Sequence, residues 1–271
     1  MIRRIAICFA YDGAAYRGWQ KQEGVEPTVQ ATLELAIAKI AQEPVALTVC
    51  GRTDKGVHAL RQIAHFDTSA ERKLHNWIRG VNHYLPADIS VQYAREVGVD
   101  FHARYCAQRR FYRYLLYPSC IQPIFLRQKV GWTFRTLKVT EMERALHMLL
   151  GKQDFSSFRS KDCQAKTALK TLYHGRVYPF KEAICFDFAA DGFLHHMIRN
   201  IVGALVEVGA GRLSKAQFEA LVAAKSRREA PPTFSASGLY FLGARYPSSF
   251  GVSLPKLPEL FWGYNELFNQ D

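Results

Sequence analysis

The sequence predicts an α+β protein made of two similar halves, each with strands and helices in the order β-α-β-β-α-β. Segments in which apolar residues alternate or run together, as in strands, are interleaved with segments in which they recur at helical spacing. The same succession of elements starts again at about residue 107. Apolar residues make up 48% of the 271-residue chain, which is enough to bury a sizeable core.

The first half is predicted to contain a helix with Thr28 as its N-cap, directly after Pro27. Its elements are a strand at 3–11, this helix at 28–42, strands at 46–50 and 59–69, a helix at 71–85 and a strand at 89–97. This order is the split βαβ arrangement of ferredoxin-like folds. A charged loop, VCGRTDKGVHAL at 49–60, separates the two middle strands.

The second half repeats this order without a residue-by-residue repeat of the sequence. Its elements are helices at 140–151 and 194–209 and strands at 111–118, 175–180, 183–190 and 238–247. An insertion at 156–170 and a further helix at 214–225 distinguish it from the first half. We therefore predict an N-terminal α/β half at 1–106 that carries the charged loop, a C-terminal α/β half at 107–247 and a peripheral extension at 248–271. The halves would join into one mixed, largely antiparallel sheet, with helices on one face and a central basic cleft.

The chain carries 36 Lys and Arg against 24 Asp and Glu, a formal net charge of +12. This excess predicts a polyanionic partner, because it occurs in short groups along the folded chain rather than in one basic tail. The groups are Arg109/Arg110/Arg113, Lys161/Lys166/Lys170 and Lys225/Arg227/Arg228. A solvated surface with a basic bias is the alternative.

Six cysteines occur without a C-x-x-C pair, which argues against a zinc knuckle or a disulfide framework. We expect reduced thiols in a cytosolic protein. The apolar run after the two N-terminal arginines is cut short by Asp12 and has no small-residue cleavage site, so we expect no signal peptide. No apolar stretch approaches the roughly 20 residues that span a bilayer.

Asp54 lies in the charged loop, just after a predicted buried strand. Loops on a rigid scaffold commonly carry functional residues, so Asp54 is a candidate for chemistry. In the sequence TDKG, however, an aspartate also serves as an ordinary turn former. The loop alone does not decide between these two roles.

The predicted helix at 194–209 has one wide apolar face, and Arg199 lies at its edge. A partly buried guanidinium requires an acidic partner or must reach water, and both remain open for Arg199. The opposite face is formed by His196, Asn200, Gly203 and Glu207. The adjacent His195 and His196 do not predict a metal site, because neighbours on a helix diverge by about 100° and no further ligand cluster completes a set.

The segment RRFYRYLLY at 109–117 combines basic and aromatic residues at strand spacing. In a strand, Tyr112 and Tyr114 share one face, whereas Phe111 and Arg113 share the other. Interleaved cations and rings can stack a base and hold its phosphates. A half-buried edge strand with ordinary aromatic packing is the alternative.

Seven motifs along the chain resemble the tRNA pseudouridine synthase A (TruA) family. They are YDGAAYRGWQKQ at 11–22, GRTDKGVHA at 51–59, VNHYLPADI at 81–89, FHARYCAQRRFYRY at 101–114, DFSSFR at 154–159, HHMIRNIVGALVEVG at 195–209 and GLYFL at 238–242. The resemblance implies isomerisation of uridine to pseudouridine in the anticodon stem-loop of tRNA, at positions 38, 39 and 40. It also implies tRNA as the partner, a cytoplasmic homodimer whose basic clefts each use both subunits, no membrane, and neither metal nor organic cofactor.

By this resemblance, Asp54 is the essential carboxylate of a pseudouridine synthase. It could attack C1′ of the ribose or C6 of the uracil, or stabilise a cationic sugar during an elimination. Arg199 matches the arginine that pairs with this aspartate, and Tyr112 matches the tyrosine that stacks on the target uracil and is a candidate for proton transfer. The other substrate-binding residues implied are Arg52, His58, Arg109 and Arg110. Lys55 departs from the family pattern, in which the residue after the aspartate is usually small, so its effect on the choice of uridines is open.

Two other functions fit parts of the sequence. A non-catalytic RNA-binding protein would explain the charge, the aromatic residues and the architecture, but not the GRTD loop or the position of Arg199. A glycosidase-like hydrolase would use Asp54 to break a glycosidic bond. Such enzymes usually need a second positioned carboxylate, and none is evident near GRTDKG.

Overall fold

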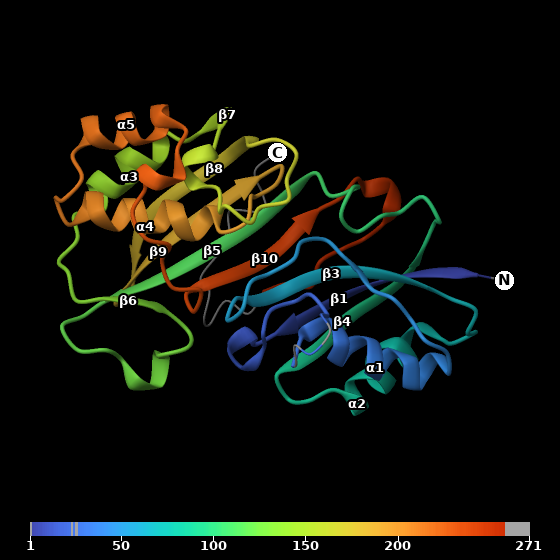
Figure 1. The fold of residues 1–271 in the computed structure, drawn as a ribbon. Helices are drawn as coiled ribbons and strands as arrows, with labels where there is room; N and C mark the ends of the chain where they lie inside the picture. Colours follow the sequence, from blue (N-terminus) through green and yellow to red (C-terminus); the bar gives the residue numbers. More distant parts are fainter. Residues whose placement is uncertain (1, 23, 25–26, 258–271) are drawn as a thin grey trace. The chain divides into compact units, whose positions relative to one another are not determined.

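The structure is a computed structural model of the 271-residue chain and describes residues 2–22, 24 and 27–257. In this part the chain is an α+β fold with ten strands and five α-helices (Figure 1). Two compact units form: unit 1 combines the residues up to Arg110 with those from Tyr240 onward, and unit 2 runs from Phe111 to Leu239. Each unit contains antiparallel pairs and a parallel pair of strands, which confirms the predicted mixed, largely antiparallel α+β class.

Unit 1 has strands in the order β4-β1-β3-β10, with β2 beside β3. Its elements are β1 (Arg3–Tyr11), α1 (Val29–Ala41), β2 (Thr48–Val49), β3 (His58–Thr68), the π-helical turn η2 (Asn76–Gly80), α2 (Val81–Tyr84), β4 (Ile89–Val97) and β10 (Leu239–Arg245). β1 lies between β3 and β4 and is antiparallel to both. In Figure 1, α1 and α2 lie together on one face of these strands. The strand expected at 46–50 is limited to the two residues of β2.

The helix α1 begins where its sequence predicts. Thr28 is the N-cap, and its hydroxyl accepts a hydrogen bond of 3.4 Å from the nitrogen of Ala31. The helix ends at Gln42, which adopts a left-handed conformation with φ of 59°. Its buried residues are Val29, Ala31, Leu33, Ala36, Ile37 and Ala41, most of which recur at helical spacing.

The helix expected at 71–85 begins later in the structure and contains the π-helical turn η2. Arg72 precedes the helix, and its Nε donates a hydrogen bond of 3.0 Å to the carbonyl of Ile40 near the end of α1, which lacks a partner within its own helix. The two helices pack closely at Gly80, where a Cβ would lie 2.7 Å from Cδ1 of Ile40. Both the segment before this helix and the helix itself are thus in contact with α1.

Unit 2 has strands in the order β5-β9-β8-β7, with β6 parallel to β5. Its elements are β5 (Arg109–Pro118), β6 (Gly131–Thr133), α3 (Val139–His147), β7 (Gly151–Asp154), β8 (Leu169–Phe180), β9 (Ala183–Ala190), α4 (Met197–Gly209) and α5 (Lys215–Ala224). β8 and β9 form a long antiparallel hairpin. Gly175 of β8 lets α3 approach, since a Cβ there would lie 3.1 Å from Cγ of Leu146. The three helices lie on the same side of these strands in Figure 1.

The start of α4 differs from the prediction. The helix was expected from residue 194 but begins at Met197. His196 is the N-cap residue and has a left-handed backbone conformation with φ of 62°, so the chain turns before the helix starts. His195 and His196 therefore do not belong to the helical face on which the sequence placed them.

The predicted polar face of α4 is wrong for Asn200 and Gly203. Asn200 is fully buried, and its Nδ2 donates a hydrogen bond of 2.8 Å to the carbonyl of Phe158. A Cβ on Gly203 would lie 2.5 Å from the carbonyl oxygen of Pro232. The chain around Pro232 covers this side of the helix, which is why residues that look solvent-facing in the sequence are buried.

The compact units differ from the predicted halves at one element. The predicted halves, 1–106 and 107–247, follow the order of elements and place β10 in the second half, whereas compactness places nearly all of it in unit 1. There, Tyr240 and Phe241 pair in parallel with the first residues of β3. The boundaries of functional domains and the basic cleft stay predictions.

Only part of the predicted extension at 248–271 can be compared with the structure. It includes a short 3-10 turn, η6 (Ser248–Phe250), and residues 258–271 lie outside the described residues. Among the helices of the described part, none has the length and apolar character needed to cross a membrane.

Candidate active site

The loop between β2 and β3 carries Asp54, and the segment after β1 fixes its backbone. The nitrogen of Trp19 donates a hydrogen bond of 3.0 Å to the carbonyl oxygen of Thr53. Gly18 has φ of +105°, and a Cβ there would lie 3.0 Å from the same oxygen and 3.1 Å from the nitrogen of Lys55. A side chain at Gly18 would therefore press on the backbone on both sides of Asp54.

The end of the loop is held by a second close contact. A Cβ on Gly13 would lie 1.9 Å from the carbonyl oxygen of Val57, so only glycine allows this approach. The nitrogen of Val57 donates a hydrogen bond of 3.2 Å to the carbonyl of Asp54. Gly56, between them, has φ of +79°. Asp54 thus opens a tight turn whose backbone is fixed at both ends.

Buried polar side chains of neighbouring strands form hydrogen bonds with the loop. The hydroxyls of Tyr11 and Thr53 share a hydrogen bond of 2.7 Å. Gln62 of β3 is fully buried, and its Nε2 donates a hydrogen bond of 3.0 Å to the carbonyl of Gly51. Burial raises the pKa of Tyr11 to about 12, so the hydroxyl stays protonated at neutral pH. Because buried polar groups cost free energy unless they are paired, these contacts favour one position of the loop.

The side chains of the loop differ in exposure. Asp54 is half-buried, whereas Arg52 and Lys55 are exposed. A carboxylate on a fixed turn needs little further ordering to meet a substrate, which lowers the entropic cost of the reaction. Exposed cations on the same loop suit contacts with phosphate oxygens.

His58 is buried, with 2% of its surface exposed. Its Nδ1 is 3.1 Å from the nitrogen of Gly13 and 2.9 Å from a carboxylate oxygen of Asp12, and its ring stacks on Tyr240 at 4.7 Å between centroids. The sequence analysis placed His58 among the substrate-binding residues. Its contacts join three segments of unit 1, and binding of a substrate by His58 stays a prediction.

Tyr112 lies on β5 in unit 2. It is 7% exposed and packs edge-on against Phe193, with 5.0 Å between the ring centroids. The next tyrosine along this face, Tyr114, is fully buried and donates a hydrogen bond of 2.9 Å to the carbonyl of Ser235. β5 pairs with both β6 and β9, so the alternative of an edge strand is wrong.

Arg113, on the other face of β5, is buried rather than part of a basic surface. It is 2% exposed, and its guanidinium binds both carboxylate oxygens of Asp187 at 2.7 and 2.8 Å. Tyr178 donates a hydrogen bond of 3.0 Å to the same carboxylate. Burial lowers the pKa of Arg113, but the hydrogen bonds and charge of Asp187 outweigh this and raise the pKa above its usual value. Arg113 therefore does not contribute to a basic surface, unlike the prediction for the group at 109–113.

Arg109 and Arg110 lie at the start of β5, and both are half-buried. Nη2 of Arg110 donates hydrogen bonds to the carbonyls of Cys50, at 3.3 Å, and Arg104, at 2.5 Å. Arg110 thus ties the Asp54 loop to the turn before β5. Contact of either arginine with a substrate stays a prediction.

Arg199 lies in the first turn of α4 and is half-buried. Its Nε donates a hydrogen bond of 2.9 Å to the carbonyl of Phe234, and the nitrogen of Phe234 donates one of 3.2 Å to the carbonyl of Arg199. This reciprocal contact orients the guanidinium within unit 2. The pairing of Arg199 with Asp54 stays a prediction.

His195 and His196 precede α4, so their side chains are not separated by the helical angle of about 100° that the sequence predicted. Their ring centroids are 3.9 Å apart. The nitrogen of His195 also donates a hydrogen bond of 3.4 Å to Sγ of Cys163. That the protein needs no metal remains a prediction from the family resemblance.

The residues that hold the loop were not among those predicted from the sequence. Gly13 and Gly18 carried a signal, because two glycines between aromatic residues in YDGAAYRGW indicate close approach of the backbone. Gln62 carried a weaker one, since a polar residue that shares a strand face with the apolar Leu60 and Ala64 needs a buried partner. Tyr11 carried none, because its hydroxyl contact is made with a distant loop.

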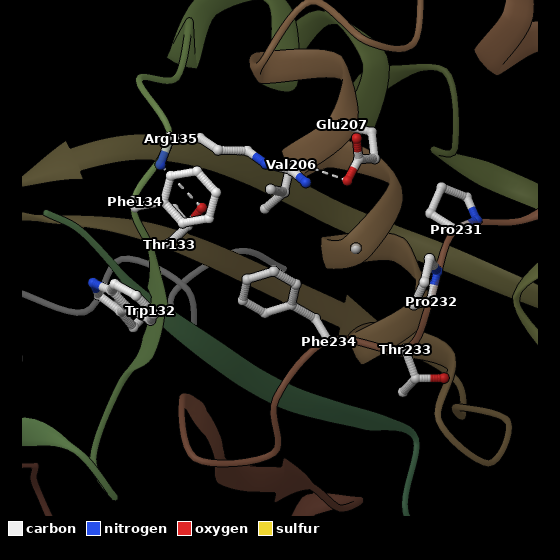
Figure 2. Close-up of a pocket in the computed structure, with 11 residues that line it drawn as sticks. Trp132, Thr133, Phe134, Arg135, Val206, Glu207, Pro231, Pro232, Thr233 and Phe234 are labelled. Atoms are coloured by element: carbon white, nitrogen blue, oxygen red, sulfur yellow. Dashed lines mark hydrogen bonds and ion pairs between the residues drawn. The ribbon is translucent and has the colours of Figure 1, made fainter. Parts of the chain in front are cut away.

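A pocket of about 260 Å³ lies in unit 2, near the segment that binds Arg199 (Figure 2). Its wall is mostly aromatic and apolar, with one ion pair between Arg135 and Glu207. The residues drawn around it include Trp132, Phe134, Pro231, Pro232 and Phe234. The pocket shares Phe234 with the contact that orients Arg199.

Comparison with known proteins assigns the chain to a family. A family model described as tRNA pseudouridine synthase matches residues 7–106 and 145–247. The tRNA pseudouridine synthase A of Neisseria gonorrhoeae is 51% identical over 257 residues, which cover 95% of this chain and 97% of the relative. That of Chromobacterium violaceum is 49% identical, covering 92% and 95%, and that of Pseudomonas aeruginosa is 43% identical, covering 97% and 90%.

Among solved structures, one described as a crystal structure of a Cbf5-Nop10-Gar1 complex covers 87% of this chain and 57% of its own. Its TM-score of 0.36 and 10% identity are too low to contribute to the assignment. The sequence matches are sufficient without it, since they extend over almost the full length of both partners. The chain belongs to the tRNA pseudouridine synthase family.

Proposed function

We propose that this tRNA pseudouridine synthase isomerises uridine to pseudouridine in the anticodon stem-loop of tRNAs, at positions 38, 39 and 40. The family model and the relatives support the reaction and the class of RNA. The observation that carries the proposal is the position of Asp54, a half-buried carboxylate on a turn whose backbone is fixed at both ends. The net charge of +12 suits a polyanionic substrate.

The chemistry requires one carboxylate and no external reactant. The bond between ribose C1′ and uracil N1 breaks, and a bond between C1′ and C5 forms. C5 loses a proton and N1 gains one, so the reaction is balanced without any transfer of electrons to a cofactor. Asp54 can serve as the nucleophile at C1′ or C6, or can stabilise a cationic sugar during an elimination. In each case the target base must first leave the helical stack.

The other residues divide into catalytic and binding roles. We assign Arg199 to an ion pair with Asp54, which favours the ionised form of the carboxylate. Tyr112 stacks on the target uracil, and its hydroxyl is a candidate for moving the proton of C5. Binding of the RNA backbone is assigned to Arg52, Arg109 and Arg110. His58 then acts indirectly, by holding the segments under the loop.

We further propose a homodimer whose basic clefts each use residues of both subunits, acting in the cytoplasm. The family resemblance supports both statements. A second subunit would let one surface hold the body of the tRNA while the other presents Asp54. Light scattering of the full chain at working concentration tests the dimer, and a monomer that is fully active contradicts it.

The substitution Asp54→Asn tests the central assignment. We expect turnover to be abolished and tRNA affinity to stay within a few-fold, since most of the binding free energy comes from phosphate contacts. Tritium release from tRNA labelled at C5 of uracil measures turnover, and filter binding measures affinity. Asp162→Asn, at an exposed position, is the control and should behave as wild type. Substantial isomerisation by Asp54→Asn would contradict the assignment.

The same assay separates the two competing functions. A non-catalytic RNA-binding protein releases no tritium at any enzyme concentration. A glycosidase-like hydrolase using Asp54 releases free uracil and leaves abasic tRNA, whereas a synthase leaves the strand intact with pseudouridine in it. Chromatography of the digested product distinguishes these outcomes.

A further inference from the structure

Tyr105 presents an exposed aromatic ring on the turn before β5. Tyr105 is 75% exposed, although tyrosine is usually intermediate in burial in folded proteins. The ring of His102 lies against it, with 4.3 Å between centroids and 31° between planes. The guanidinium carbon of Arg104 lies 5.6 Å from the centroid of the tyrosine ring. One aromatic partner and one cation thus accompany the exposed ring.

The turn that carries Tyr105 is held firmly, so the exposure of the ring is not a consequence of a loose loop. Nδ1 of His102 accepts hydrogen bonds of 3.2 Å from the nitrogens of Arg104 and Tyr105. The nitrogen of Cys106 donates one of 2.9 Å to the carbonyl of His102. These contacts fix the backbone on both sides of the ring.

The turn is also anchored in the core of unit 1. Ala103 is fully buried, and its nitrogen donates a hydrogen bond of 3.1 Å to Nδ1 of His65. Its carbonyl accepts one of 2.6 Å from the hydroxyl of Tyr246. Because the backbone of the turn is already held in place, a ligand needs to order only the side chain of Tyr105, which lowers the entropic cost of stacking on it.

Arg110 connects this turn to the Asp54 loop. The carbonyl oxygens of Arg104 and Cys50 lie 2.5 and 3.3 Å from the same Nη2 atom, so these two backbone positions are neighbours. Cys50 is four residues from Asp54, which limits the remaining separation along the chain to about 14 Å. An extended RNA strand of a few nucleotides covers such a span.

We propose that Tyr105, with Arg104, forms a stacking site for an unpaired base of the tRNA close to the target uridine. The proposal rests on tRNA being the substrate. An exposed tyrosine offers a π-face to any base, and the adjacent guanidinium can stack or neutralise a phosphate. The surroundings favour RNA over the same turn of a second copy, because Arg104, Arg109 and Arg110 make the turn basic and two such turns facing each other would repel.

Binding measurements on three variants test the site, each in the Asp54→Asn background so that no turnover occurs. Tyr105→Ala should weaken binding of an anticodon stem-loop RNA about tenfold, a loss typical of one base stack, and Tyr105→Phe should stay within about twofold of the parent. The control is Tyr84→Ala, which removes an equally large ring that is 52% exposed on α2 and should leave affinity unchanged. Fluorescence anisotropy at one fixed ionic strength is the measurement.

Photocrosslinking gives a direct readout that does not depend on activity. Stem-loop RNAs with 4-thiouridine at single loop positions should crosslink to the peptide 101–107 in the parent and in Tyr105→Phe, and not in Tyr105→Ala. In the active enzyme, Tyr105→Ala should raise KM about tenfold and change kcat less than threefold. Unfolding midpoints of all variants should agree within experimental error, because the ring makes few buried contacts.

The outcomes separate this site from the proposed reaction. If Tyr105→Ala binds RNA as tightly as Tyr84→Ala, or if the crosslinks to 101–107 are missing, the stacking site is wrong while isomerisation by the wild type can still be observed. If the wild type binds RNA through this site but forms no pseudouridine, the proposed function fails instead. A change in oligomeric state on Tyr105→Ala, with unchanged RNA affinity, would assign the ring to a protein interface and overturn the proposal.

Discussion

Glycine residues hold the loop of unit 1 that carries Asp54. Gly18 combines a positive φ with close contact to the loop backbone at Thr53 and Lys55. Gly211, after α4, has φ of +72° but no atom within 4 Å of an added Cβ. The two glycines therefore share a strained backbone conformation and differ in the contact with the loop.

This difference predicts the effect of Gly18→Ala. Both Gly18→Ala and Gly211→Ala should lose about 1–2 kcal/mol of unfolding free energy, because an L-residue is disfavoured at positive φ. Only Gly18→Ala should also displace the turn at Asp54, and we expect its kcat to fall at least tenfold. Urea unfolding and single-turnover isomerisation measure the two effects. Equal activity of the two variants would show that the turn tolerates the added methyl group.

At the scale of elements, β5 divides its side chains between two environments. Tyr112 faces Phe193, whereas Arg113, on the other side, pairs with Asp187 of β9. Tyr178 of β8 completes the buried group, so three adjacent strands are joined through one carboxylate. A buried ion pair adds little stability by itself, but the loss of one partner leaves an uncompensated charge in the interior.

Removing that carboxylate should therefore be costly. We expect Asp187→Ala to lower the free energy of unfolding by about 3–5 kcal/mol, since it leaves the buried guanidinium of Arg113 without its carboxylate. The control is Glu141→Ala, which breaks the exposed pair with Arg144 on α3 and should cost about 0–1 kcal/mol. Urea denaturation followed by circular dichroism measures both. Similar losses for the two variants would mean that water reaches Arg113 in the folded protein.

Local patterns predict the elements well where local interactions decide them. The hydroxyl of Thr28 and the apolar spacing after it give α1, and alternation gives the two faces of β5. Predictions from the sequence were wrong where contacts with distant segments determine which residues are buried. It placed Asn200 on a polar face because Pro232 and its neighbours, which cover that face, lie more than thirty positions away.

The candidate site follows the same division. Asp54 could be predicted because several ionisable residues are concentrated in one short loop, and the family motifs then gave it a role. The support by Tyr11 and Gln62 could not, since their partners in the loop become neighbours only when β1 and β3 pair. The left-handed conformation of His196 likewise could not be predicted, because few residues other than glycine adopt positive φ and nothing in the local sequence marks this one.

At the scale of the whole molecule, formal charge overstates the cations that can meet RNA. Arg113 is neutralised by Asp187 in the core. Arg227 donates hydrogen bonds to the carbonyl of Ala230 and the side chain of Asn200, and burial lowers its pKa. In two of the three predicted basic groups, one arginine is therefore engaged by contacts within the fold. The net charge of +12 is unchanged, but the exposed cations such as Arg52 are the ones that can release counterions from RNA.

Salt dependence separates these exposed cations from groups that bind by stacking. In the Asp54→Asn background, the logarithm of the tRNA dissociation constant should rise linearly with the logarithm of salt concentration. Arg52→Ala should weaken binding and reduce the magnitude of that slope by about one, because one phosphate contact and its released counterion are lost. Tyr105→Ala should weaken binding without changing the slope, since stacking releases no counterion. A slope that is unaffected by Arg52→Ala would remove Arg52 from the phosphate contacts. A reduced slope for Tyr105→Ala would mean that loss of the ring releases Arg104 from its phosphate, so that the two side chains act as one unit.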